Sequence, residues 1–336
     1  MLKFKKQSLS LLMVLTLLVS LVDKAMSQKV TVPKDTSFAL YSTYVKTKKA
    51  YPNIQMVSEA MPKKVKAKKD IAYCVVNSSR SLSLDVFHPS RKVKKGYPAV
   101  ILIHGGGWRS GDRSQNVPLA QQLAKNGYVA VNVEYRLSTE ALYPAAVQDV
   151  KAAIRWTRAN ANSYRIDTSK IAVLGFSAGG QLASLIGTTN GMKKFDEGNT
   201  CNSTYSSKVQ AIVDLDGTLA FIHPESGEGD DSKGKSAATL WFGVPKAENP
   251  ALWHEAGALN HVSPQTPPIL FINSSVARMH AGRTDMIGKL NQYNIYSEVQ
   301  SFPEAPHVFP LFHPWFNDTV KYTVNFLDKV LKGSSN

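Results

Sequence analysis

The sequence predicts an α/β fold in which a mostly parallel sheet carries helices on both faces. Residues 97–104, YPAVILIH, form a continuous apolar run, which is typical of a strand buried on both faces. From Tyr97 onwards, such runs alternate with segments of helical periodicity. Upstream, the β-rich segments IAYCVV and LSLDVFHP are separated by NSSR, which predicts a leading hairpin.

The alternating segments define the expected order of elements along the chain. Strands are expected over residues 71–76, 82–89, 97–104, 128–136, 170–177, 209–217, 267–273 and 295–303. Helices are expected over residues 117–127, 143–161 and 178–187, where apolar residues recur at helical spacing. Residues 218–260 show no clear periodicity, which indicates an insertion over the carboxyl edge of the sheet.

The beginning of the chain has the features of a cleaved secretory signal. Lysines at positions 3, 5 and 6 precede an apolar run from about Leu9 to Val22, and the small residues Ala25 and Ser27 suit cleavage after Ser27. The run is shorter than the roughly 20 residues that a membrane-spanning helix needs. We therefore expect a secreted or periplasmic protein with no stable insertion in a membrane.

These patterns divide the chain into three parts. We expect a signal peptide at residues 1–27 and an irregular, Lys-rich N-terminal extension at residues 28–70. The remaining residues, 71–334, are expected to form one folded domain, since α/β domains of this size occur.

The chain is strongly basic, with 40 Lys and Arg against 25 Asp and Glu and a formal net charge of +15. Part of the excess lies in the runs KTKKAYPN, PKKVKAKKD and RKVKKGYP. Such an excess favours an anionic partner, although lysine runs are also common on solvated surfaces. Because no nucleic-acid-binding motif accompanies the charge, we expect an anionic polysaccharide as partner and no nucleic acid.

The chain has two cysteines, Cys74 and Cys201. An oxidising location would permit a disulfide between them, but sequence alone does not show that they are close. Two isolated cysteines exclude a metal site built from four thiolates.

Residues 175–180, GFSAGG, lie between an expected strand and an expected helix. They fit the pattern Gly-x-Ser-x-Gly at a strand-to-helix turn, where the backbone of the serine is strained and its neighbours must lack bulk. The hydroxyl of Ser177 would point up from the sheet at the start of the helix. This context indicates that Ser177 is a nucleophile.

Residues 104–108, HGGGW, end the run that begins at Tyr97. In a glycine-rich loop at this place, backbone N–H groups can turn inwards and donate to a developing oxyanion. We expect these donors to be Gly106 and Gly107, with Ala178 as a third. His104 is expected to be a structural hydrogen-bonding residue.

These motifs, with VNVEYRLSTEALYPAAVQDVKAAIRWTRANA between them, resemble those of the α/β-hydrolase esterases, especially the carbohydrate-esterase and feruloyl-esterase-like branch. The similarity is close over residues 97–190 and looser over residues 208–330. It implies an eight-stranded sheet, a serine nucleophile, an acyl-enzyme intermediate, and neither cofactor nor metal. Residues 71–334 would then be the catalytic domain. In that family the position of Asp149 usually serves structure, so Asp149 is left out of the site.

The resemblance also implies a catalytic base and an acid. His307, in SFPEAPHVF, matches the family's closing loop after the last strand, and His313 is the competing candidate. The acid usually follows the strand before the last one, but the first carboxylate after residues 269–272 is Asp285. We expect Asp285 to orient His307. The alternatives are Asp216, directly after the strand at residues 209–215, then Glu225 or Glu304.

The long polar loop before Asp285 also carries Arg278, His280 and Arg283. Cations near the base suit a substrate carboxylate, which arginine binds with a matching fork, although they could equally pair with acids of the protein. We expect all three to bind substrate. Among the tryptophans that could stack on a sugar face, we expect Trp108 to do so, with Trp241 and Trp315 as further candidates.

The sequence therefore predicts a secreted serine esterase that removes esters from plant cell-wall polysaccharide, with pectin as the expected polymer and methyl galacturonate or acetyl esters as the expected groups. Ser177 would attack the ester carbonyl while His307 transfers the proton. An acetylxylan or feruloyl esterase is the nearest alternative, followed by a peptidase or lipase of the same fold. A non-catalytic glycan-binding protein is the alternative of another class, favoured by the missing near acid.

Overall fold

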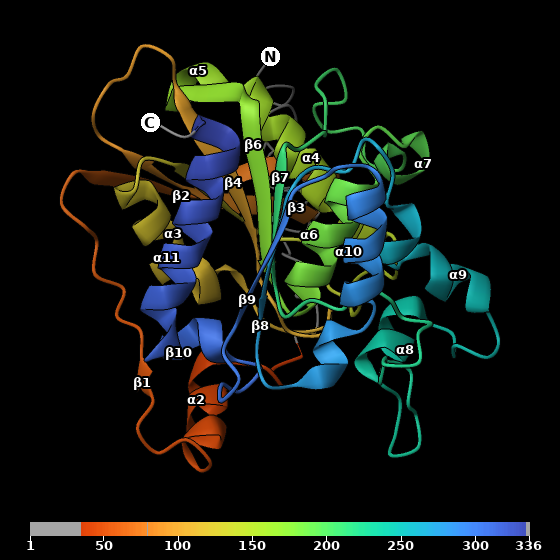
Figure 1. The fold of residues 1–336 in the computed structure, drawn as a ribbon. Coiled ribbons are helices and arrows are strands. Elements are labelled where there is room, and N and C mark those ends of the chain that lie inside the picture. Colours follow the sequence, from red (N-terminus) through yellow and green to blue (C-terminus); the bar gives the residue numbers. More distant parts are fainter. Residues whose placement is uncertain (1–34, 79, 334–336) are drawn as a thin grey trace, which may run out of the picture.

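A computed structural model describes residues 35–333 except residue 79. The predicted signal peptide lies outside the described residues. The main sheet has eight strands in the order β2-β3-β5-β4-β6-β7-β8-β9 (Figure 1). β3 is antiparallel to β2 and β5, and the remaining neighbours are parallel. The predicted mostly parallel eight-stranded sheet is confirmed.

The strands of this sheet are β2 (Val65–Asn77), β3 (Arg80–Pro89), β4 (Tyr97–Ile103), β5 (Val129–Val133), β6 (Ile166–Phe176), β7 (Ala211–Leu215), β8 (Ile269–Asn273) and β9 (Ser297–Ser301). The helices are α2 (Leu40–Lys48), α3 (Val117–Lys125), α4 (Ala145–Ala159), α5 (Ala161–Tyr164), α6 (Ala178–Thr188), α7 (Lys193–Asp196), α8 (Ala237–Phe242), α9 (Pro250–Glu255), α10 (Arg283–Gln292) and α11 (Trp315–Leu327).

The central strands are apolar throughout because both of their faces are covered. Along β4, Ile101 and Ile103 pack into the core beneath α4, α6 and α10. The alternate residues Val100 and Leu102 pack into a second core beneath α3 and α11. Side chains of a strand alternate between faces, so burial on both sides requires the continuous apolar run that the sequence shows.

The N-terminal extension is more ordered than the sequence predicts. It contains α2, the short strand β1 (Gln55–Met56) and the first residues of β2. β1 pairs with β10 (Phe312–His313), which lies near the opposite end of the chain. In Figure 1, α2 lies below the sheet, beside β10. Tyr44 and Tyr51 pack against the core under α11, so this segment is an integral part of the fold.

The insertion at residues 218–260 folds over the carboxyl ends of the strands and includes α8 and α9. Its aromatic residues Phe221, Trp241, Phe242 and Trp253 are buried against one another. Trp108 of the HGGGW loop stacks on Trp241 with ring centroids 4.6 Å apart, which ties the insertion to the sheet. The segment lacks helical periodicity because it forms a compact aromatic cluster of short elements.

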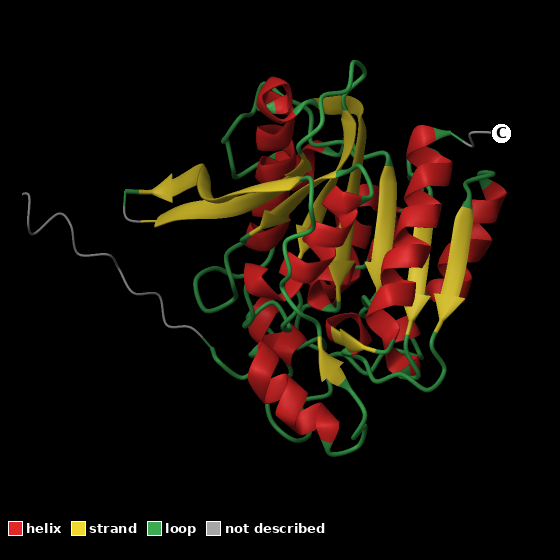
Figure 2. Cartoon of the chain, turned by 90° about the vertical axis from the view of Figure 1, so that its left-hand side faces the viewer, coloured by secondary structure: helices red, strands yellow, loops and turns green. Residues whose placement is uncertain are grey.

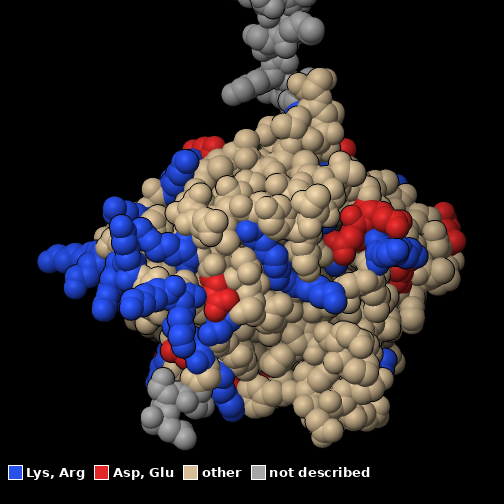
Figure 3. Space-filling view, turned by 90° about the horizontal axis from the view of Figure 1, so that it is seen from above, with Lys and Arg blue, Asp and Glu red and all other residues tan. Residues whose placement is uncertain are grey.

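The basic residues are unevenly distributed. Figure 3 views the molecule from above Figure 1, and Lys and Arg gather on the left of that face. Figure 1 shows the beginning of β2 and the loop after β3 in this region. Figure 2 shows the β2–β3 hairpin projecting from the rest of the molecule. This face carries the amino ends of the parallel strands, away from their carboxyl ends, where β6 meets α6 at Ser177.

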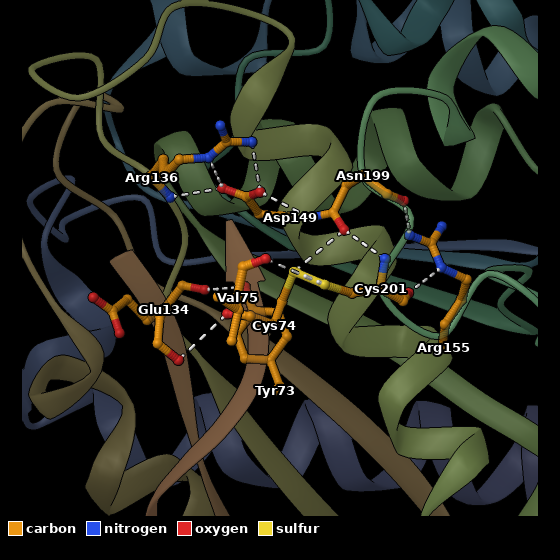
Figure 4. The surroundings of a disulfide bond; sticks show 10 residues. Tyr73, Cys74, Val75, Glu134, Arg136, Asp149, Arg155, Asn199 and Cys201 are labelled. Atoms are coloured by element: carbon orange, nitrogen blue, oxygen red, sulfur yellow. Dashed lines mark hydrogen bonds and ion pairs between the residues drawn. A yellow bond between two sulfur atoms is a disulfide. The ribbon is translucent and has the colours of Figure 1, made fainter. Parts of the chain in front are cut away.

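Cys74 of β2 and Cys201 form a disulfide with their Cα atoms 5.6 Å apart (Figure 4). The bond fastens the edge strand to the loop after α7. Around it, the side chain of Asn199 accepts a hydrogen bond from the Cys201 N–H (3.0 Å) and donates to Asp149 Oδ1 (3.2 Å). Asp149 also binds the Arg136 guanidinium through two hydrogen bonds of 2.8 Å. The structural role expected for Asp149 agrees with this geometry.

Candidate active site

Ser177 occupies the sharp turn between β6 and α6. Its backbone has φ 56° and ψ −121°, a strained conformation for a non-glycine residue. A Cβ added to Gly175 would lie 1.9 Å from the carbonyl oxygen of Gly179, and one added to Gly179 would lie 2.2 Å from that of Ile103. Both flanking positions therefore require glycine, and the turn presents the Ser177 hydroxyl at the N-terminus of α6.

His307 lies in the loop after β9 and connects the serine to a carboxylate. Ser177 Oγ donates to His307 Nε2 over 2.8 Å. On the other side of the ring, His307 Nδ1 donates to Asp216 Oδ2 over 2.9 Å. The ring also packs on Phe176, with centroids 5.0 Å apart. The three side chains form the hydrogen-bonded series of a serine-hydrolase triad.

The expectation that Asp285 orients His307 is wrong. Asp285 lies in the first turn of α10, where its side chain is 64% exposed and binds His223 Nε2 at 2.9 Å. Asp216 takes its place because it directly follows β7, the neighbour of β6 in the sheet. The Ser177 N–H donates to the Leu215 carbonyl over 2.9 Å, so the ends of these two strands meet at the site.

The other candidates for acid and base also lie elsewhere. Glu225 accepts a hydrogen bond from the Gly282 N–H over 3.1 Å, and Glu304 is exposed. His313 belongs to β10, where it pairs with Gln55 of β1. None of the three takes part in the hydrogen-bonded series around Ser177.

The loop that was expected to carry the acid instead holds Asp216 in position. The Ser274 N–H donates to Asp216 Oδ1 over 2.9 Å, and the Ser274 hydroxyl binds Oδ2. Asn273 Nδ2 lies 3.4 Å from Oδ1. His280 Nε2 also lies 3.4 Å from Oδ1, although it makes no hydrogen bond of good geometry there. Four residues of other segments, including His307, thus surround one buried carboxylate.

The surroundings of Asp216 favour its charged form. Burial alone would raise its pKa, but the polar groups of His280, His307 and Ser274 outweigh that effect and hold the pKa of Asp216 below its ordinary value. Two residues earlier, burial raises the pKa of Asp214 to about 7, and the neighbouring charge of Asp216 adds to this rise. The two aspartates therefore have opposite environments, and Asp216 is the anion that can stabilise a protonated His307.

The HGGGW loop lies beside Ser177, as expected. Gly106 and Gly107 have φ values of 123° and 59°, which favour glycine at both positions. Ala178 is the first residue of α6, and N–H groups in the first turn have no partner within the helix. All three line the pocket that contains Ser177 and His307. His104 is buried and stacks on Tyr135, in agreement with a structural role.

The pocket has a volume of about 560 Å³, within the usual range for small-ligand sites. Each of its two arginines is paired with an acid that also lines it. Arg109 Nε lies 2.6 Å from Asp35 Oδ2, and an Arg278 terminal nitrogen lies 3.1 Å from Glu228 Oε1. The lining is therefore close to neutral. Burial raises the pKa of Glu228, against the opposing charge of Arg278.

Three of the residues expected to bind substrate have other surroundings. Arg283 donates to Asn273 Oδ1 over 2.6 Å and does not line the pocket. His280 faces Asp216 and is also absent from the pocket lining. Trp108 contacts the pocket, but only 3% of it is exposed, because its ring is stacked on Trp241. Stacking of Trp108 or Trp241 on a sugar is therefore excluded, and Trp315 packs edge-on against Tyr51.

Several pocket residues could not be predicted from the sequence. Asp35, Ser37 and Phe38 come from the N-terminal extension, and Glu228 and Leu240 come from the insertion. Both segments lack the periodicity from which a position in the fold could be inferred. Asp216 had a visible signal, since a carboxylate directly after a buried strand lies at the carboxyl edge of the sheet.

Neither a metal-binding cluster nor a membrane-spanning helix is found in the described part of the chain. Across residues 35–333 apart from residue 79, no three His, Cys, Asp or Glu side chains are grouped to hold a metal ion. In the same residues, no helix combines the length and apolar character that crossing a membrane requires.

Comparison with known proteins gives the same fold and relates the chain to esterases. The chain is 29% identical to a probable carboxylic ester hydrolase, LipM of Mycobacterium tuberculosis, over 69% of this chain and 54% of that protein. A bifunctional GH43-CE protein of Bacteroides eggerthii has a TM-score of 0.66 and 26% identity over 78% of this chain and 38% of its own. A truncated carbohydrate esterase from gut microbiota has a TM-score of 0.65 and 24% identity over 82% of this chain and 100% of its own.

The extent of these similarities differs between the relatives. The chain spans about half the length of the mycobacterial relatives LipM and LipC that it matches. The match to the BD-FAE family covers residues 84–279, from β3 to the turn before α10, and includes Ser177 and Asp216. By this match and by its fold, the chain belongs to the BD-FAE family of α/β-hydrolase esterases.

Proposed function

We propose that this chain is a serine carboxylic ester hydrolase that acts on esters carried by polysaccharides. The observation that carries the proposal is the hydrogen-bonded series from Ser177 through His307 to Asp216, with Ser177 open to a pocket. A strained backbone at a serine costs free energy, and such strain is found mainly where the side chain has to be presented to a ligand. The geometry therefore favours an enzyme over a non-catalytic glycan-binding protein.

In this proposal Ser177 Oγ attacks the ester carbonyl while His307 Nε2 accepts its proton. The negatively charged Asp216 fixes the His307 tautomer and stabilises the resulting cation. Backbone N–H groups of Gly106, Gly107 and Ala178 stabilise the tetrahedral oxyanion. His307 then protonates the departing alcohol, and a water molecule, activated by the same histidine, hydrolyses the acyl-enzyme.

Polysaccharide esters are the substrate class best supported by the relatives. The similar structures include a truncated carbohydrate esterase and a bifunctional GH43-CE protein, and the second shares 26% identity with the chain. Within this class we propose pectic polysaccharide, with the acetyl ester of a sugar hydroxyl as the group removed. The acetyl ester is favoured because the arginines in the pocket are paired with Asp35 and Glu228, which leaves a nearly neutral lining.

A methyl ester of galacturonate is the second candidate for the bond cleaved. It is neutral at the scissile group, and Arg278 has 53% of its side chain exposed, so this guanidinium could also contact a neighbouring uronate. Acetylxylan and feruloyl esters are the further alternatives within the class, and a lipase or peptidase activity has no specific observation in its favour.

We further propose that the protein works outside the cytoplasm. The charged and apolar pattern of residues 1–27 supports export, and the Cys74–Cys201 disulfide supports an oxidising location. Measurement of the N-terminal residue of the protein recovered from its native host tests this proposal. A chain that begins at Gln28 is the expected result, and a chain that retains residues 1–27 would contradict it.

The activity is tested with the variant Ser177→Ala on p-nitrophenyl acetate. We expect kcat to fall by at least about 10³-fold, since the nucleophile is lost while the oxyanion donors remain. Ser203→Ala, at an exposed loop position, is the matched control and should keep full activity. Labelling of Ser177 by a fluorophosphonate probe is the second expected result. A variant that retains a substantial rate, or a protein that is not labelled, would overturn the assignment.

The substrate is tested by the product released. Acetylated pectin, methyl-esterified pectin, acetylated xylan and a feruloylated arabinoxylan are incubated with equal enzyme, and acetate, methanol and ferulate are measured. Acetate from pectin at the highest kcat/KM is expected. Preferential release of methanol from pectin would support the second candidate, and preferential release from xylan or arabinoxylan would contradict the pectic proposal.

A further inference from the structure

A continuous basic surface lies outside the pocket. It consists of nine exposed residues in two segments, Lys63, Lys64, Lys66, Lys68 and Lys69 before and within β2, and Arg91, Lys92, Lys94 and Lys95 in the loop between β3 and β4. We refer to these nine residues as the basic surface. Figure 3 shows Lys and Arg gathered in this region of the molecule.

The fold brings the two segments of the basic surface together. The Ser90 N–H donates to the Lys64 carbonyl over 2.8 Å, which places Arg91 and the following lysines beside the start of β2. Along the β2–β3 pair, Lys66 lies opposite His88 and Lys68 lies opposite Val86. Residues about 25 positions apart in sequence thus form one patch on one corner of the sheet.

The positive charge of the basic surface is not neutralised within the described structure. Asp70, the acidic residue in these two segments, is paired with Arg113 at 2.9 Å. Among the ion pairs of the described residues, none includes one of the nine basic side chains. Nine cations gathered in this way repel one another, so a bound polyanion would relieve an unfavourable electrostatic energy.

Protection of a sheet edge explains only part of this arrangement. β2 is an edge strand, and lysines on an edge strand discourage pairing with other chains. Lys66, Lys68 and Lys69 could serve that purpose. The four basic residues at positions 91–95 lie in a loop with no unpaired strand edge, so protection of an edge does not account for them.

The basic surface and the pocket lie at opposite ends of the same strand. β4 begins directly after the loop that contains Lys94 and Lys95, and ends before the HGGGW loop that lines the pocket. A strand of seven residues spans roughly 20 Å. None of the nine residues lines the pocket. The basic surface therefore cannot contact the bond that is cleaved.

We propose that the basic surface binds an anionic polysaccharide with repeated carboxylates and so holds the protein on its polymeric substrate. Eight of the nine residues are lysines, whose compact charges suit carboxylates spaced along a chain. The large exposed apolar side chains that insert into a lipid surface and the aromatic rings that stack on bases are absent from both segments. These features favour a polyuronate over a membrane or a nucleic acid.

Binding of this kind would raise the local concentration of ester groups without adding a contact at Ser177. Binding by the basic surface rests on the proposed function for its purpose. It can be measured even if the proposed esterase activity is absent, because binding of the polymer requires no turnover. We use the Ser177→Ala protein for binding, so that hydrolysis cannot alter the polymer during the measurement.

The test compares two variants with the same change in charge. In the first, Lys66, Lys68, Lys92, Lys94 and Lys95 are changed to Gln. In the matched control, five exposed lysines elsewhere, at positions 193, 208, 233, 235 and 321, are changed to Gln. Binding to polygalacturonate is measured at about 0.05 and 0.5 M salt, because screening weakens contacts between exposed charges. Activity on p-nitrophenyl acetate is measured with the same lysine substitutions in proteins that retain Ser177.

We expect the first variant to bind polygalacturonate at least tenfold more weakly than the parent at low salt, and the control variant to differ from it by less than threefold. Both variants should keep the parent activity on p-nitrophenyl acetate. Equal losses in the two variants would show that net charge alone binds the polymer and would overturn the proposal. Tighter binding of the parent protein to anionic vesicles or duplex DNA than to polygalacturonate would also overturn it.

Discussion

The carboxylate of Asp216 shows what an orienting acid requires at the level of single residues. It is buried, yet it is surrounded by polar groups of Ser274, Asn273, His280 and His307. A buried anion is tolerated only when such groups replace the water that it has lost. The exposed Asp285 has no comparable surroundings, so its position in sequence was a poor guide to its role.

The different positions of the two aspartates predict different effects of substitution. We expect Asp216→Asn to lower kcat on p-nitrophenyl acetate by roughly 10²–10⁴-fold, because the amide neither holds the His307 tautomer nor stabilises its cation. Asp285→Asn, which removes a charge beside His223 on the surface, should change kcat less than twofold. Steady-state kinetics of both variants provide the measurement. A reversed order of effects would return Asp285 to the site.

Asp214 has the opposite electrostatic environment to Asp216. Burial raises its pKa to about 7, although the Gly217 N–H and the Ser184 hydroxyl both donate to its side chain. The unfolded chain ionises this group near pH 4. Between about pH 4 and pH 7 the folded state therefore binds more protons at this site than the unfolded state. The contribution of Asp214 to stability falls as pH rises through this window and is constant above it.

Asp214→Asn should remove this contribution to the pH dependence, because the amide does not ionise and can accept from the Gly217 N–H while donating to the Ser184 oxygen. We expect the free energy of unfolding of the variant, relative to the parent protein, to rise steadily between pH 4 and pH 7. Urea denaturation at intervals of half a pH unit measures the difference. If that difference is independent of pH, Asp214 does not take up a proton on folding.

At this scale the sequence predicted the partners that lie at fixed places in a recognisable turn or loop. Ser177 and the three candidate oxyanion donors belong to short motifs, and His307 follows the last strand of the sheet. The acid was less predictable because several carboxylates lay within reach of the strand ends. The choice between Asp216 and Asp285 depends on which carboxylate is buried among hydrogen-bond donors. Those donors come from segments distant in sequence, so the residues next to each aspartate do not predict them.

At the scale of elements, the disulfide compensates for the exposed position of β2. This strand lies at the edge of the sheet and pairs only with β3, and Cys74 fastens it to the loop after α7. The closed loop spans 127 residues, so the bond restricts the unfolded chain considerably. The network of Asn199, Asp149 and Arg136 then continues from the disulfide to α4 and the loop after β5.

The double variant Cys74→Ala/Cys201→Ala should be less stable by about 2–5 kcal/mol, since the unfolded chain gains freedom. Activity on p-nitrophenyl acetate at 25 °C should be little changed, because neither residue lines the pocket. Urea unfolding of the variant, and of the parent protein with and without a reducing agent, gives the comparison. Equal stability of all these forms would mean that the bond does not stabilise the fold.

The elements that were predicted well are those in which apolar residues recur regularly along the sequence. The central strands and α3, α4 and α6 follow directly from apolar runs and helical spacing. The extension and the insertion were predicted poorly because their burial depends on distant partners. β1 pairs with β10 at the other end of the sequence, and the insertion is organised by contacts among aromatic residues.

At the scale of the whole molecule, the parallel sheet separates two surfaces by the length of its strands. The carboxyl ends carry Ser177 and its partners, while the amino end of β4 adjoins the basic surface. An acyl group could be cleaved at one end while charged parts of a polymer are held at the other. The overall charge of the sequence indicated an anionic partner, but only the fold separates the two locations.

The pocket also joins residues from both ends of the chain, since Asp35 and His307 line it together. During synthesis, Ser177 emerges long before His307, and β1 has no partner until β10 follows. The site of a nascent chain therefore stays incomplete until His307 has been made. Because His307 and β10 lie close together in sequence, the segment that completes the hydrogen-bonded series also pairs with β1, so the site and this part of the fold are completed together.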